Sequence, residues 1–105
     1  MTSAKRKPRE DPSAPFLFQR MFTRLGCDGR PPRFHVEFFP YASLTLTIRR
    51  REEMVLVRLS DLLARASRTV LEGAAALLLA RMYRKKAPAS LVAPYLAYAR
   101  SARTR

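Results

Sequence analysis

Residues 70–82 constrain the fold of this chain more than any other segment, because only Glu72 and Arg81 interrupt their apolar surface. Apolar residues recur there at helical spacing and extend nearly all the way round the helix; one stripe consists of Leu71, Ala74, Leu78 and Met82. A helix this apolar belongs in the middle of a fold, packed against a sheet and other helices. The longest apolar run, 73–80, falls well short of the ~18 residues of a membrane span. We therefore predict a core helix over about 68–84 and no membrane-spanning segment.

Three segments ahead of this helix are typical of strands. Residues 33–39 alternate between an apolar face with Phe34, Val36 and Phe38 and a second face with His35, Glu37 and Phe39. Residues 44–49 alternate leucine and isoleucine with threonine, and residues 54–59 form the most apolar strand of the three. The last two segments are close enough in sequence to pair as an antiparallel hairpin. We predict a small antiparallel three-stranded meander.

Start and stop signals place three more helices around these strands. Pro15 opens a helix that ends before Gly26, and Ser60 with Asp61 can cap a short helix over 62–66. Ser67 can cap the core helix, and a last helix spans 90–101 with Pro94 in its first turn, the only turn that tolerates proline. The fold class is therefore α+β, with helices covering one face of the meander. We expect a flexible basic tail over 1–14, one domain over 15–101 and a frayed terminus over 102–105.

The charge of the chain points to acidic ligands. Its 105 residues carry 21 Lys and Arg against 8 Asp and Glu, a formal net charge of +13. A balance this basic favours contact with a polyanion such as nucleic acid, at least nonspecifically. The favoured alternative is a solvated surface charge in an arginine-rich composition, because the basic residues are dispersed and no aromatic residues interleave with them. The candidate polyanion contacts are Lys5, Arg6, Lys7, Arg49, Arg50, Arg51, Arg84, Lys85 and Lys86.

Three side chains, His35, Glu37 and Cys27, are candidates for chemistry. His35 and Glu37 lie on the same face of a strand, so both can reach one ion, but two ligands make a weak metal site and a local ion pair is the favoured explanation. Cys27 is the only cysteine and has only His35 as a candidate base, which favours an incidental free thiol. The single cysteine and the absence of a secretory signal pattern are compatible with a cytoplasmic protein. We predict no catalytic residues, no metal ligands and no cofactor.

The chain resembles the N-terminal region of bacterial SprT-like zinc metallopeptidase proteins over residues 34–83. The matching pieces are HVEFFPYASL at 35–44, TIR at 47–49, VRLSDLL at 57–63, VLE at 70–72 and LLLARMYR at 77–84. In that family a downstream domain carries HExxH, in which two histidines bind zinc and the glutamate activates water. This sequence has no HExxH, and Gly73 to Ala76 stand where a metal site would need His and Glu.

The resemblance thus implies a fold and an ancestry without zinc ligands, either as a separated accessory module or as a product truncated before a catalytic half. We expect a non-catalytic interaction module whose partner is a protein or a separate catalytic domain. The alternative is a small basic nucleic-acid-binding protein that uses its tail and Arg49 to Arg51.

Overall fold

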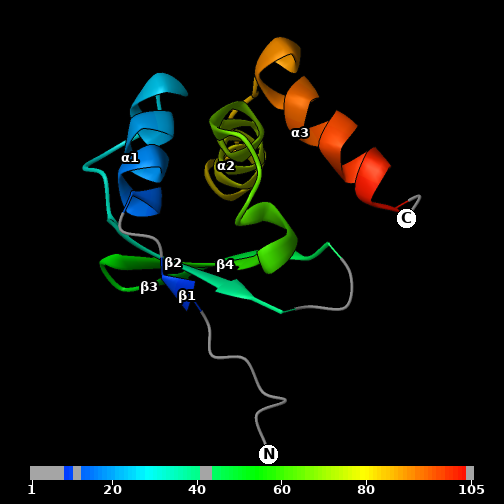
Figure 1. Ribbon diagram of the computed structural model, residues 1–105. Helices are drawn as coiled ribbons and strands as arrows, with labels where there is room; N and C mark the ends of the chain where they lie inside the picture. Colours follow the sequence, from blue (N-terminus) through cyan, green and yellow to red (C-terminus); the bar gives the residue numbers. More distant parts are fainter. Residues whose placement is uncertain (1–8, 11–12, 41–43, 104–105) are drawn as a thin grey trace, which may run out of the picture.

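The computed structural model describes residues 9–10, 13–40 and 44–103, and Figure 1 shows the arrangement of their helices and strands. In chain order the elements are β1 (Arg9–Glu10), α1 (Ala14–Arg24), β2 (Arg33–Phe39), β3 (Leu46–Arg51), β4 (Met54–Ser60), the 3-10 turn η1 (Asp61–Leu63), α2 (Arg68–Tyr83) and α3 (Ala89–Arg103). The helices lie on one side of a single sheet (Figure 1). The predicted α+β class is confirmed.

The predicted antiparallel meander is wrong in one pairing. The strand order is β1-β2-β4-β3, so β4 lies between β2 and β3. The predicted hairpin of β3 with β4 is present and antiparallel, but β2 pairs in parallel with β4 and does not pair with β3. The sheet is therefore mixed, and the chain passes from β2 to the far edge before β4 returns to the centre.

The apolar content of the strands accounts for this order. The central strand β4 has Val55, Val57 and Leu59 buried beneath the helices, whereas β3 ends in three exposed arginines. A strand with buried apolar residues gains most from neighbours on both sides, and charged side chains suit an edge strand because they discourage pairing with other chains. Alternation alone identifies the faces of a strand but not its neighbours.

The chain ends also differ from the sequence prediction. Within the predicted tail, Arg9–Glu10 form a short strand that pairs antiparallel with β2, and α1 begins at Ala14. At the other end α3 continues to Arg103, beyond the predicted end of the domain at residue 101. The other residues assigned to the tail, 1–8 and 11–12, lie outside the described residues, as do 104–105.

The predicted serine caps are present. The Ser60 hydroxyl accepts a hydrogen bond from the Leu62 N–H at 3.2 Å, and the Ser67 hydroxyl accepts one from the Val70 N–H at 3.4 Å. These bonds satisfy backbone donors that the first turn of a helix leaves free. The short helix after Ser60 is a 3-10 turn of three residues rather than the longer predicted segment.

Pro94 lies inside α3, past the first turn in which it was expected. A proline there removes one intrahelical hydrogen bond, so packing must keep the helix continuous. That packing is tight: a Cβ on Gly73 would lie 2.9 Å from both the Leu91 carbonyl oxygen and the Tyr95 Cβ. The backbones of α2 and α3 therefore approach closely at Gly73, and the Tyr98 hydroxyl also donates to the Leu62 carbonyl of η1.

The hydrophobic core lies between the sheet and the helices. Its fully buried side chains come from α1, β2, β4, η1 and α2; the largest are Phe18, Phe22, Met21, Leu59, Leu63 and Leu79. The helix predicted to be the core helix, α2, has eight buried residues and is confirmed in that place. Among the described residues no helix combines the length and apolar character needed to cross a bilayer.

Candidate binding surfaces

One face of the sheet is covered by none of the described helices, and we call it the open sheet face. Parallel pairing of β2 with β4 and antiparallel pairing of β3 with β4 align its side chains in three rows across the strands. From β2 across β4 to β3 the rows are Arg33, Met54 and Arg51; His35, Leu56 and Arg49; and Glu37, Arg58 and Thr47. These three rows hold four arginines and one carboxylate, Glu37, and in β1 a second acid, Glu10, is in register with Glu37.

Ion pairs on the open sheet face concentrate at one end. Glu37 lies 3.2 Å from His35 Nε2 and 3.8 Å from Arg58 Nε, and the Arg58 guanidinium stacks over the Phe39 ring at 5.1 Å. Within the described part of the chain, Arg49 and Arg51 have no carboxylate within 4.0 Å. A shallow hollow lined by Arg49, Arg51, Arg58 and Leu56 lies between β3 and β4. The unpaired positive charge thus gathers around Leu56.

His35 and Glu37, the candidate metal ligands, form an ion pair on the surface. Both side chains are partly exposed, and the second partner of Glu37 is Arg58. Among the residues that the structure describes, no group of three or more His, Cys, Asp and Glu side chains is placed to hold a metal ion.

The structure separates the candidate polyanion contacts. Arg49 and Arg51 lie on the open sheet face, whereas Arg50 points to the helix side, near Tyr83. At the end of α2, Arg84 has a left-handed backbone with φ 55, Lys85 pairs with Asp28 at 3.7 Å and Lys86 is exposed. Lys5, Arg6 and Lys7 lie outside the described residues.

Sequence reasoning missed two arginines of the open sheet face, Arg33 and Arg58. Each is a lone arginine in a strand, so neither belongs to a run of charges. They join Arg49 and Arg51 only because β4 lies between β2 and β3. The signal available in the sequence was the period-2 alternation of each strand, which places Arg33 and Arg58 opposite the apolar face.

A second surface is an apolar groove along the two C-terminal helices, which we call the α2–α3 groove. Two adjoining hollows share Leu77, Arg81 and Leu96, and together they extend from Leu46 of β3 to Val92 of α3. The Leu96 side chain is 48% exposed, the highest value for a leucine among the described residues. The cations Arg81, Lys85 and Arg100 border the groove.

The C-terminal segment that lines most of the α2–α3 groove contains basic residues but no acidic ones. From residue 73 to residue 105 the chain has seven Lys and Arg and no Asp or Glu. Asp28, on the loop after α1, pairs with the groove cation Lys85 at 3.7 Å. The groove therefore combines an apolar floor with a cationic border.

The lone cysteine is not an activated nucleophile. Cys27 is packed against the core, and burial raises the pKa of its thiol; Lys85 opposes this rise and Asp28 adds to it. Burial likewise raises the pKa of the neighbouring Tyr83 hydroxyl, with Arg50 lowering it and Cys27 raising it. A nucleophilic cysteine needs the opposite shift, so these surroundings favour the protonated thiol of Cys27.

Both raised pKa values make stability fall at alkaline pH. The folded state holds these two protons more tightly than the unfolded chain, so their contribution is complete below the unfolded pKa values and is lost as pH rises through the folded ones. We expect the urea midpoint to fall from about pH 8.5 upward, where free thiols begin to ionise. Cys27→Ser and Tyr83→Phe should each make this fall shallower; pH profiles parallel to that of the unmodified protein would contradict the assignment.

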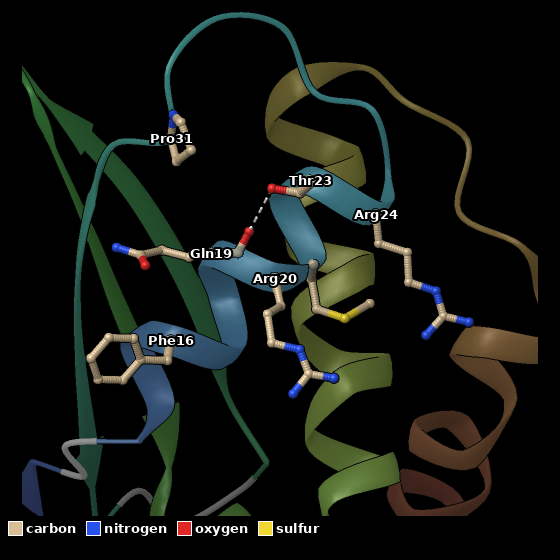
Figure 2. A pocket seen from close by; sticks show the side chains of 7 residues that line it. Phe16, Gln19, Arg20, Thr23, Arg24 and Pro31 are labelled. Carbon is tan, nitrogen blue, oxygen red and sulfur yellow. Dashed lines mark hydrogen bonds between the residues drawn. The ribbon is translucent and has the colours of Figure 1, made fainter.

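A third hollow, on α1, has no chemical group that points to a reaction. Figure 2 shows its lining: Phe16 and Gln19 extend to one side of α1, and Arg20 and Arg24 extend to the other. The Thr23 hydroxyl donates to the Gln19 carbonyl oxygen at 3.3 Å, which engages it in the helix. Arg20 also pairs with Glu72 of α2 at 3.7 Å, so this surface helps to hold α1 on α2.

Comparison of the chain with protein-family models, with curated proteins and with solved structures finds no match.

Proposed function

We propose that this chain is a non-catalytic interaction module that binds a protein partner through the α2–α3 groove. The observation that carries the proposal is the exposed Leu96 above an apolar floor that includes Leu77 and Val92. Covering apolar surface stabilises a complex by roughly 25 cal/mol per Å². An apolar strip with a charged border is typical of a surface that a partner covers.

The partner that fits this groove presents an acidic amphipathic helix. Two packed helices leave a groove into which a third helix can lay its apolar side chains. Acidic residues beside that apolar stripe would face Arg81, Lys85 and Arg100, and residues 73–105 contain no acid to repel them. Complementary charge raises the association rate and rejects basic partners.

The resemblance to SprT-like proteins supports the same function. In that family the peptidase chemistry lies in a downstream domain, and no residue of this chain matches its zinc ligands. A separate chain that carries the catalytic part is the partner that the resemblance suggests. As an accessory module, this protein would hold that chain without taking part in the hydrolysis.

The test uses a designed acidic amphipathic peptide that carries leucines at helical spacing along one face and glutamates beside that face. Fluorescence anisotropy measures the affinity of the protein for this peptide. We expect Leu96→Ser to weaken binding at least about tenfold, because hot-spot side chains at interface centres have effects of this order. The matched control is Phe16→Ser, which removes an exposed apolar side chain from α1, outside the groove. Equal affinities of the two variants would contradict the proposed groove.

The non-catalytic part of the proposal has its own test. Purified protein is expected to retain no stoichiometric zinc after dialysis and to leave an unfolded protein substrate intact. Binding of one equivalent of zinc together with cleavage of that substrate would overturn the assignment as an accessory module.

A further inference from the structure

We propose that the open sheet face binds single-stranded nucleic acid. This inference concerns a different surface from the α2–α3 groove and does not depend on the protein partner proposed above. The centre of the site is the hollow around Leu56, between Arg49, Arg51 and Arg58. Arg33 and Phe39 of β2 border it on the same face.

The arginines are placed for a phosphate backbone. Arg49 and Arg51 are two residues apart on one strand, about 6.8 Å along it, and project from the same face. A guanidinium offers a planar fork of donors that matches phosphate oxygens, and it gives up its hydration more readily than an ammonium group. Both side chains are exposed and have no carboxylate within 4.0 Å among the described residues, so they can take a phosphate without breaking an ion pair.

Apolar side chains lie beside the arginines, where a base can pack against them. Leu56 is half-buried in the hollow, and Met54 in the adjacent row is 42% exposed. The Arg58 guanidinium lies over the Phe39 ring, with its central carbon 5.1 Å from the ring centroid, so this pair offers the outer side of the guanidinium to a base. Unstacked bases pack on such planes, with sequence tolerance because every base has a flat face.

The shape favours a single strand over a duplex. The described helices all lie on the opposite side of the sheet, so no helix projects from this face to enter a major groove (Figure 1). An acidic protein surface would pair with the arginines, but it would not offer Met54 and Leu56 the flat face of a base to pack against. The paired bases of a duplex would be equally unable to reach them.

The acidic residues near the face define the limits of the site. Glu37 is engaged by His35 and Arg58 at one end. Glu52 and Glu53 in the β3–β4 turn line the surface beside Arg33 and Arg51 at the other end. The middle row of the face, with Leu56 and Arg49, therefore lies between these two acidic borders.

The test is a salt titration of binding to a fluorescein-labelled oligothymidylate, followed by anisotropy. The double variant Arg49→Gln with Arg51→Gln should bind at least about tenfold more weakly and should lower the log–log salt slope by about 1.4, the value for two lost phosphate contacts on a single strand. The control is Arg81→Gln with Arg100→Gln, which removes the same charge from the α2–α3 groove and should leave the slope unchanged. Far-UV circular dichroism checks that each variant is folded.

Several outcomes would overturn the inference. The first two are an equal loss of affinity for the oligothymidylate in both double variants, and no binding of the oligothymidylate at about 50 mM salt. The other two are tighter binding to the matched duplex than to the oligothymidylate, and tighter binding to phosphatidylserine vesicles than to the oligothymidylate. The two proposals fail separately. Leu96→Ser should keep full affinity for the oligothymidylate, and the Arg49 and Arg51 double variant should keep full affinity for the acidic peptide.

Discussion

Replacement of Val57 by lysine is expected to unfold the domain at room temperature. Val57 has 0% exposure and lies in the central strand, paired with Val36 of β2 and Ile48 of β3 beneath the helices. A buried ammonium without a partner costs several kcal/mol, which is comparable with the whole stability of about 5–15 kcal/mol of a small domain. Urea unfolding followed by circular dichroism measures the loss.

The matched control for Val57→Lys is Met54→Lys in the same strand. Met54 is 42% exposed on the open sheet face, so a lysine there keeps its charge in water. We expect this variant to differ from the unmodified protein by no more than about 0.5 kcal/mol, as most surface substitutions do. If both lysines unfolded the domain, the sheet would be covered on both faces, and the open sheet face would not exist.

Truncation of Phe22 to alanine is expected to cost about 3–5 kcal/mol of stability. Phe22 is 2% exposed, and its ring meets Tyr83 edge-on at 5.2 Å and Phe34 at 6.4 Å. One side chain therefore joins α1 to both α2 and β2. The smaller residue leaves a cavity that the surrounding elements can fill only in part.

The comparison for Phe22→Ala is Phe16→Ala on the same helix. Phe16 is 66% exposed, so its truncation removes few contacts and should change the unfolding free energy by less than about 1 kcal/mol. The urea midpoints of the two variants should differ widely. Similar midpoints would mean that α1 is not anchored by the face that carries Phe22.

Local features of the sequence predicted much of the fold. The apolar surface of α2 placed it in the core, and Ser60 and Ser67 marked helix starts that the structure confirms. The hairpin of β3 and β4 also followed from the sequence, because the two strands are joined by a short turn. Each of these features depends on residues close together in the chain.

The features that were not predicted depend on contacts between distant segments. Alternation in β2 shows which residues share a face, but it cannot show that β4 rather than β3 is the neighbour. This pairing brings Arg33 and Arg58 to the surface that carries Arg49 and Arg51. The α2–α3 groove likewise depends on the close approach of two helices at Gly73. In the sequence, Gly73 is only one of several small residues in this helix, so its contact with α3 could not be predicted.

An NMR titration of the ¹⁵N-labelled protein, first with oligothymidylate and then with the acidic amphipathic peptide, tests the two proposed binding surfaces most directly. We expect two separate sets of shifted signals. The oligonucleotide should shift the Nε–H signals of Arg49, Arg51 and Arg58, and the peptide should shift the amide signals around Leu77 and Leu96. Shifts from both ligands spread over all basic residues alike, with no distinction between the open sheet face and the groove, would contradict this expectation.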